Sequence, residues 1–257
     1  MRNIKITLEY DGTHYFGWQT QRKEHRTIQA TVEKALHKIL SAKVRVAGSG
    51  RTDSGVHAVA QVANFKTNSA LPLKKLRLAL NALLPWDITV TRVEEADPDF
   101  DACRHVHGKV YRYVILNRPY RSSFLKEKAA FCPFPLDVAL MRRESKCLVG
   151  KHDFRAFCAS GSSAKTTVRT VRAISIKKIA CAMWGMSPGD IVRLISVDIE
   201  ADGFLYNMVR NIVGSLIEVG RGRFPAGSIK NILSSKDRRR AGPTAAACGL
   251  YLMKVNY

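Results

Sequence analysis

The sequence predicts an α+β fold of two similar halves, each with an order close to β-α-β-β-α-β and an antiparallel sheet flanked by helices. Apolar and polar residues alternate over residues 4–10, which is typical of a strand with one buried face. Apolar residues recur with helical spacing over residues 28–39 and 205–219. The 257 residues are 46% hydrophobic, enough for a folded core. We expect a cleft between the halves.

The first half is expected to span residues 1–105. Thr27 is a good N-cap for a helix, and Pro72 suits the first turn of another. The expected elements are a strand at 4–10, a helix with Ile28, Val32, Ala35, Leu36 and Ile39 on one side, a short strand at 43–47, a strand at 58–65 with Val59, Ala63 and Phe65 on one face, a helix with Leu76, Leu80, Leu83 and Leu84, and a strand at 87–93.

The second half, residues 106–257, repeats the theme with longer connections. Its expected elements are strands at 110–116, 168–179, 191–200 and 249–255, and helices at 136–148, 205–219 and 229–233. In the helix at 205–219, the expected buried residues are Val209, Ile212, Val213, Leu216 and Ile217. A loop at 181–189 joins two of the strands.

The charge is strongly positive, with 42 Lys and Arg residues against 21 Asp and Glu residues and a net of +21. Such a field attracts polyanions, of which nucleic acid is the commonest. The first half carries 16 basic and 11 acidic residues, a net of +5, and the second carries 26 and 10, a net of +16. We therefore expect the second half to supply most of the surface for a polyanion.

Apolar stretches such as 80–84 and 110–116 are far shorter than the roughly 20 residues that a membrane span needs. The first residues have no apolar core of the kind found in signal peptides. We expect a cytoplasmic protein without a membrane partner.

A glycine-rich segment at 47–58 lies between two expected strands and contains Arg51 and Asp53. Its glycines permit unusual backbone angles and close approach of a ligand. A carboxylate on a loop braced by two strands can act as a nucleophile or a base. The alternative is a tight turn in which the aspartate caps its own backbone.

Two further segments carry candidate residues. Tyr111 and Tyr113 share one face of a strand in a segment with alternating basic residues, Lys109 and Arg112, and aromatic side chains on a sheet can stack on bases. Alternatively, one or both tyrosines belong to the core. Arg210 lies near the apolar face of the helix at 205–219, where it needs an acidic partner unless its head group reaches water. His105 and His107 are too few for a metal site.

Six motifs, in order over nearly the whole chain, resemble those of the TruA family of tRNA pseudouridine synthases. They are Asp11-Gly12-Thr13-x-Tyr15-x-Gly17-Trp18-Gln19, the segment 50–58, Lys109-Val110-Tyr111-Arg112-Tyr113, the segment 150–154, the segment 208–214 and Ala241-Gly242-Pro243-Thr244-Ala245. The resemblance implies the pseudouridine synthase fold with an active-site cleft between the halves. It also implies a homodimer, without metal or organic cofactor, that isomerises uridines 38, 39 and 40 in the anticodon stem-loop of tRNA.

The resemblance also assigns roles to individual residues. Asp53 matches the catalytic aspartate, Tyr111 the tyrosine that stacks on the target uracil, and Arg210 the basic partner of the aspartate. Arg51 matches a loop arginine that helps to hold the flipped nucleotide. Lys165, which stands where many members carry arginine, is assigned to substrate binding. Ser54 replaces a common alanine, and the loop at 181–189 is longer and more apolar than usual, which bears on the choice of tRNA.

Three other functions compete with this one. An RNA-binding module without catalysis explains the charge and the aromatic strand, but gives no reason for Asp53 in its glycine-rich loop. A carboxylate-dependent nucleoside hydrolase would release free uracil and would not need the large positive charge. A DNA-binding regulator is disfavoured because the sequence has no helix-turn-helix signal.

Overall fold

The computed structural model describes residues 1–21, 25–182 and 191–257. The chain forms two compact units, one of residues 1–109 with 251–257 and the other of residues 110–250. The sequence division at residue 105 places residues 251–257 in the second half, whereas these residues pack in the first unit.

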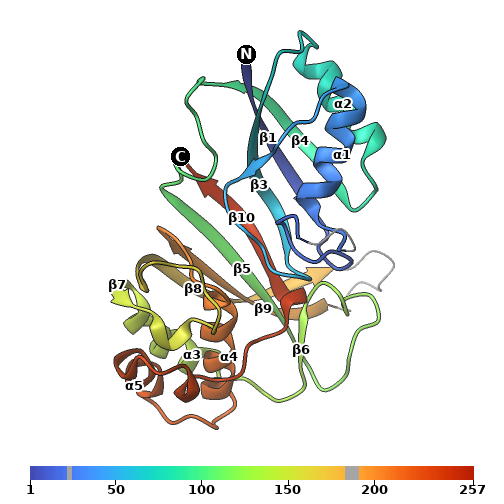
Figure 1. Cartoon of the computed structure of the whole chain (residues 1–257). Helices are drawn as coiled ribbons and strands as arrows, with labels where there is room; N and C mark the ends of the chain where they lie inside the picture. The colour runs from blue at the N-terminus through green and yellow to red at the C-terminus, as the bar shows by residue number, and fades with distance from the viewer. Residues whose placement is uncertain (22–24, 183–190) are drawn as a thin grey trace. The chain divides into compact units, whose positions relative to one another are not determined.

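The first unit has the predicted order β-α-β-β-α-β, followed by one strand from the far end of the sequence (Figure 1). Its elements are β1 (Arg2–Tyr10), α1 (Ile28–Leu40), β2 (Ala47–Gly48), β3 (His57–Thr67), α2 (Leu73–Leu83), β4 (Ile88–Ala96) and β10 (Leu250–Asn256). The strand order is β4-β1-β3-β10, with β2 paired to β3. The neighbours of β1 are antiparallel, while β10 runs parallel to β3, with Tyr251 opposite His57. The sheet is therefore mixed rather than purely antiparallel.

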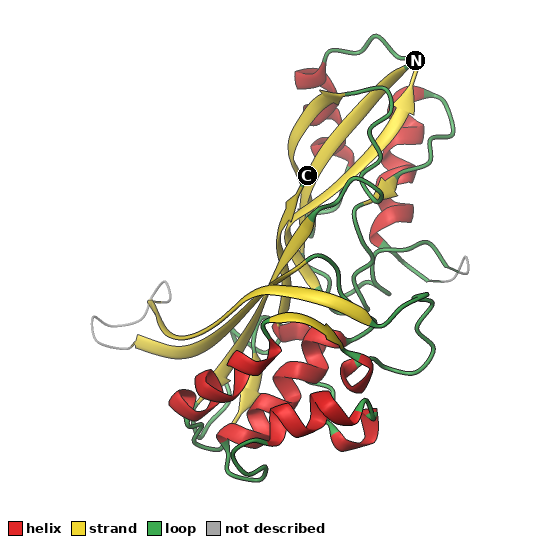
Figure 2. Ribbon diagram, turned by 90° about the vertical axis from the view of Figure 1, so that its left-hand side faces the viewer, coloured by secondary structure: helices red, strands yellow, loops and turns green. Residues whose placement is uncertain are grey.

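Both helices of the first unit lie on one face of its sheet (Figures 1 and 2). Thr27 caps α1 as predicted, because its side chain accepts a hydrogen bond from the backbone N–H of Ala30. Pro72 is the N-cap residue of α2 rather than its first helical residue. The core between sheet and helices is built from Ile4, Ile6, Leu8, Ile28, Val32, Leu36, Phe65, Leu76 and Leu80, all at most 2% exposed.

The second unit contains more strands than the sequence predicts. Its elements are β5 (Gly108–Asn117), β6 (Ala130–Cys132), α3 (Val138–Ser145), β7 (Gly150–Asp153), β8 (Val168–Ala182), β9 (Ile191–Ala201), α4 (Met208–Gly220) and α5 (Ser228–Ser235). Antiparallel pairing joins β7 to β8 and β8 to β9, while β6 is parallel to β5. The short strands β6 and β7 were not predicted, since three or four residues carry almost no periodic signal.

Helix α4 is the centre of the second unit's core. Ile212, Val213 and Leu216 are fully buried, as predicted, whereas Ile217 is partly exposed. Helices α3 and α5 both pack against α4 beside the sheet (Figure 1). This arrangement fixes α4 from several sides.

Two predictions for the first unit are wrong in detail. Residues 43–46 do not form a strand, because pairing with β3 begins only at Ala47, opposite Asn64. Val59 is 44% exposed and does not share a face with the buried residues Ala63 and Phe65. The pairing of β1 with β3 contains a bulge near this point, and one extra residue reverses the alternation of side chains.

The exposed side of α2 also differs from the prediction. Leu83 is 46% exposed, so it does not share the buried position of Leu76 and Leu80.

No helix in the described part of the chain is long and apolar enough to cross a membrane. The predicted loop at 181–189 lies largely outside the described residues.

Candidate active site

The loop that carries Asp53 connects β2 to β3 and is closed by backbone hydrogen bonds. The N–H of Ser49 donates to the carbonyl of Val62 (2.8 Å), and the N–H of Val56 donates to the carbonyl of Asp53 (3.1 Å). Gly55 within this turn has a φ of +76°, which favours glycine. The backbone therefore makes the tight turn that the sequence allowed, with Ser54 and Gly55 at its tip and Asp53 as its first residue.

A buried polar network supports the loop from below. The amide of Gln61, fully buried on β3, donates to the carbonyl of Gly50 (2.9 Å), and its oxygen accepts from the Ser49 hydroxyl (2.5 Å). The hydroxyl groups of Tyr10 and Thr52 are 2.8 Å apart. Burial raises the pKa of Tyr10, so this hydroxyl stays neutral. The network holds the loop on both sides of Arg51.

Two glycines of the segment 11–19 press against the same loop. A Cβ atom on Gly12 would lie 2.0 Å from the carbonyl oxygen of Val56, and one on Gly17 would lie 2.4 Å from that of Thr52. Gly17 also has a φ of +80°. The N–H of Trp18 donates to the Thr52 carbonyl (3.0 Å). This close backbone packing explains why the motif at 11–19 accompanies the Asp53 loop.

Arg51 is exposed and Asp53 is partly exposed, so both side chains are accessible from solvent. A carboxylate at the start of a braced turn is preorganised, because the loop does not have to be ordered when a ligand arrives. Thr52, between them, is buried and anchors the turn.

The two tyrosines of β5, in the second unit, have different environments. Tyr113 is fully buried, and its hydroxyl donates to the carbonyl of Ala246 (2.7 Å). Tyr111 is 7% exposed, and its ring meets the edge of Phe204 with centroids 5.0 Å apart. Arg112, on the other face, forms a bidentate ion pair with Asp198 at 2.7 and 3.0 Å. Tyr113 is thus a core residue, and only Tyr111 stays a candidate for stacking.

Arg210 lies in the first turn of α4, partly buried, with two of its donors fixed. Nε donates to the carbonyl of Ala245 (2.7 Å), and Nη1 donates to Oδ1 of Asn207 (2.8 Å). Asn207 precedes the helix with a φ of +58°, a conformation that asparagine tolerates better than most residues. These contacts orient the guanidinium.

The segment 241–245 that holds Arg210 is itself fixed by Arg238. Arg238 donates to the Gly242 carbonyl (2.9 Å), to Oδ1 of the fully buried Asn211 (2.9 Å) and to the Thr244 hydroxyl (3.0 Å). A Cβ atom on Gly214 would lie 1.7 Å from the carbonyl oxygen of Pro243. The helix and the segment therefore touch backbone to backbone.

The remaining sequence candidates are less constrained. Lys165 is exposed in the connection before β8. His105 Nδ1 accepts a hydrogen bond from the N–H of Asp101 (3.2 Å), which gives it a local structural role. In the part of the chain that the structure describes, no group of three or more His, Cys, Asp or Glu side chains is arranged to hold a metal ion.

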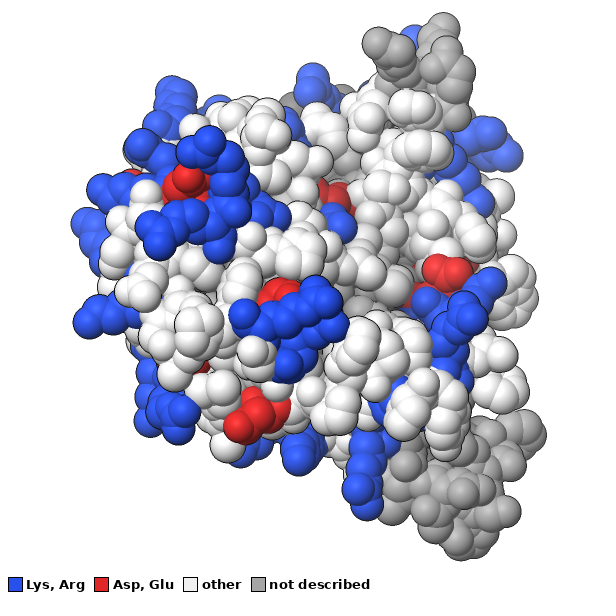
Figure 3. Space-filling model, turned by 90° about the horizontal axis from the view of Figure 1, so that it is seen from below, with Lys and Arg blue, Asp and Glu red and all other residues white. Residues whose placement is uncertain are grey.

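The surface of the second unit is basic around α5 and the segment that follows it. Exposed residues there include Arg223, Lys230, Lys236, Arg239 and Arg240. Figure 3 shows Lys and Arg side chains spread over one face of the molecule, with few acidic groups among them. A long anionic chain would be attracted to such a face.

Residues 6–103 and 145–257 match a family model described as tRNA pseudouridine synthase. The chain belongs to the tRNA pseudouridine synthase family. The two matched segments include Asp53, Arg51, Arg210 and Lys165, whereas Tyr111 lies in the stretch between them.

Several curated relatives are similar to this synthase along its full length. A protein of Acetivibrio thermocellus named tRNA pseudouridine synthase A is 45% identical over 257 residues, and one of Clostridium botulinum with the same name is 47% identical. A third, from Thermoanaerobacter pseudethanolicus, is 44% identical. In each case the alignment covers 100% of both chains.

In this synthase the structure places the predicted site residues in two groups. Arg51 and Asp53 lie in the first unit, and Tyr111, Lys165 and Arg210 lie in the second. Sequence patterns do not indicate the residues that hold them, chiefly Gln61, Asn207 and Arg238. Gln61 bonds to Gly50, which is 11 positions away in the chain, and Asn207 bonds to Arg210, which is 3 positions away. Arg238 bonds to Asn211, which is 27 positions away. No periodic pattern in the sequence links such pairs.

Proposed function

We propose that this chain isomerises uridine to pseudouridine at positions 38, 39 and 40 of the anticodon stem-loop of tRNA, as a cytoplasmic homodimer without a cofactor. Membership of the tRNA pseudouridine synthase family supports the reaction and the substrate class. The observation that carries the residue assignment is the braced loop in which partly exposed Asp53 begins a hydrogen-bonded turn, which keeps one carboxylate in an accessible place.

The reaction breaks the N1–C1′ glycosidic bond, turns the uracil and joins C5 to C1′. It needs no redox step and no phosphoryl transfer. The target base is stacked in RNA, so it must first leave the stack, at a cost of a few kcal/mol. Asp53 then acts in its ionised form, as a nucleophile or as a base.

Arg210 is the proposed basic partner of Asp53. A guanidinium favours the charged form of a neighbouring carboxylate and can orient it through hydrogen bonds. The contacts of Arg210 with Asn207 and Ala245 support this role, because they fix the side chain before substrate arrives. An arginine held in this way loses little freedom on binding.

The other assigned residues bind the substrate. Tyr111 is proposed to stack on the target uracil, Arg51 to hold the flipped nucleotide, and Lys165 to contact the RNA. Base stacking on an aromatic ring contributes about 1–3 kcal/mol, which would offset the cost of flipping. The basic surface of the second unit would bind phosphates without regard to sequence.

The test is Asp53→Asn, assayed on tRNA by carbodiimide labelling of pseudouridine. We expect no detectable turnover and nearly unchanged tRNA binding, because the amide keeps the shape of the carboxylate without its charge. Turnover by the variant would refute the role of Asp53. Release of free uracil by the unaltered protein would instead indicate a hydrolase, and binding without any modification would indicate an RNA-binding module.

A further inference from the structure

Lys109 belongs to the first unit and lies beside the Asp53 loop. It is the second residue of β5, and its Nζ occupies the space that a side chain at Gly50 would fill: a Cβ atom there would lie 2.3 Å from Nζ. Gly50 immediately precedes Arg51 and is three residues before Asp53. The amine of Lys109 therefore lies against Gly50 in the loop that carries Asp53.

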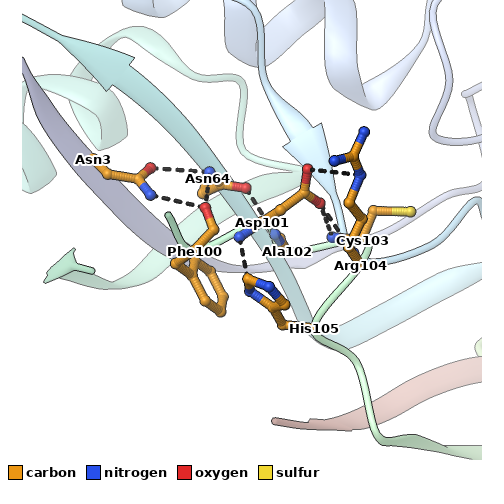
Figure 4. A network of polar contacts seen from close by, with 8 residues as sticks. All are labelled: Asn3, Asn64, Phe100, Asp101, Ala102, Cys103, Arg104 and His105. Atoms are coloured by element: carbon orange, nitrogen blue, oxygen red, sulfur yellow. Dashed lines mark hydrogen bonds and ion pairs between the residues drawn. The ribbon is translucent and has the colours of Figure 1, made fainter. Parts of the chain in front are cut away.

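A polar network holds residues 100–102, in the segment that leads to β5 (Figure 4). Asn64 donates to Asn3 Oδ1 (2.9 Å) and to the Phe100 carbonyl (3.1 Å), and accepts from the N–H of Ala102 (2.9 Å). Two residues before Lys109, the N–H of His107 donates to the Asn256 carbonyl (2.9 Å). These bonds tie the segment before Lys109 to the sheet of the first unit.

The amine of Lys109 makes no hydrogen bond or ion pair with any residue in the described ranges 1–21, 25–182 and 191–257. Its burial lowers the pKa of Lys109, and Cys103 acts in the opposite direction. The side chain nevertheless keeps partial exposure to solvent. An ammonium that is partly removed from water without a partner is unfavourable for stability, and such groups cluster at binding sites.

We propose that Lys109 binds a backbone phosphate of the RNA next to the uridine on which Asp53 acts. This inference rests on the proposed function. An ammonium offers three donors and a compact positive charge, which suits a phosphodiester oxygen. RNA brings one such anion with every nucleotide, and exposed Arg51 lies next to Gly50 on the same loop. Gly50 leaves space for the Lys109 amine, and the phosphate would supply the partner that the described residues do not.

The test measures tRNA binding and turnover for Lys109→Met, with Lys74→Met as the control. Lys74 is exposed on α2, so its variant has the same change of charge away from the loop. We expect Lys109→Met to weaken tRNA binding about tenfold, as for the loss of one charge-assisted contact. The slope of log affinity against log salt should become less steep by about 0.7–0.9. The value of kcat should change less than threefold, and the control should match the unaltered protein.

Two further variants separate a phosphate contact from a folding defect. Lys109→Arg keeps the charge and should restore most of the affinity. Gly50→Ala keeps Lys109 but displaces its amine, and should lower affinity in the same direction as Lys109→Met. Unchanged tRNA affinity and salt slope in Lys109→Met would overturn the proposal. A large loss of kcat with unchanged affinity would also overturn it, because Lys109 would then act on Asp53 rather than on a phosphate.

The proposed function can fail separately from this inference. If the unaltered protein forms no pseudouridine in tRNA, the function is wrong whatever Lys109 does. If it forms pseudouridine and Lys109→Met matches it in affinity, salt slope and rate, only the role of Lys109 is wrong.

Discussion

The loop that carries Asp53 and the start of α4 that carries Arg210 are held in different ways. The loop is fixed mainly through its backbone, by close contact with Gly12 and Gly17 and by hydrogen bonds to buried side chains. Arg210 is fixed through its side chain, by Asn207 and by a carbonyl of the segment 241–245. Backbone contacts restrain the Asp53 loop as a whole, whereas the position of Arg210 depends on a few individual side-chain hydrogen bonds.

The largest effect in this comparison is expected from Gly17→Ala. The new Cβ atom would collide with the Thr52 carbonyl, displace the turn and move the Asp53 carboxylate. A displacement of about 1 Å can lower kcat about 100-fold. The measurement is single-turnover formation of pseudouridine in tRNA at saturating protein.

Gly161→Ala is the matched control for Gly17→Ala. Gly161 has nearly the same φ, +79°, but nothing lies within 4 Å of its Cβ position. It should show only the strain of a left-handed alanine, about 1–2 kcal/mol, and normal kcat. Equal losses of activity in both variants would mean that backbone strain, rather than contact with the loop, explains Gly17.

A smaller effect is expected from Arg238→Met on the Arg210 side. The variant leaves the Gly242 carbonyl without the Arg238 donor and removes one of two donors to the buried Asn211 oxygen, which keeps the Thr244 hydroxyl (2.7 Å). This should lower the free energy of unfolding by about 2 kcal/mol. The loss of order in segment 241–245 should lower kcat about tenfold, since Arg210 keeps its contact with Asn207. Denaturant unfolding and steady-state kinetics measure the two effects.

Arg239→Met is the control for Arg238→Met. Arg239 is exposed and paired with Asp237 at 2.9 Å, and a solvent-exposed pair of this kind contributes little to stability, so the variant should unfold like the unaltered protein. If Arg238→Met is destabilised but keeps its kcat, segment 241–245 supports the fold without orienting Arg210.

The smallest effect is expected from Tyr111→Phe. The phenyl ring keeps its contact with Phe204 and its stacking surface, so kcat should fall less than about threefold. Tyr111→Ala removes the ring and should cost far more, about 1–3 kcal/mol for stacking alone. A large loss in Tyr111→Phe would show that the hydroxyl matters more than the ring.

The sequence predicted those parts of the structure that depend on a local residue pattern. The alternation from Ile4 to Tyr10 predicted β1, and Thr27 marked the start of α1. The glycines around Asp53 predicted a special backbone, because only glycine permits such close approach.

Features that depend on distant partners could not be predicted in this way. Val59 turned outward because of a bulge set by pairing with β1, and nothing in its own neighbours indicates that. Tyr111 and Tyr113 have the same spacing and type in the sequence, yet only the latter bonds to Ala246, 133 positions away. The roles of Lys109 and Arg238 likewise arise from contacts that the fold creates.

The strand β10 gives the protein an unusual order of assembly. Residues 251–257 complete the sheet of the first unit, where Tyr251 pairs with His57 and the Tyr257 hydroxyl donates to the Ala102 carbonyl (2.9 Å). A ribosome that has made residues 1–109 has therefore not yet made all of that sheet. The second unit is a continuous stretch, residues 110–250, and can fold as soon as it emerges. Synthesis of the unit that carries Asp53 thus begins first, but its sheet is completed only after the second unit has been made.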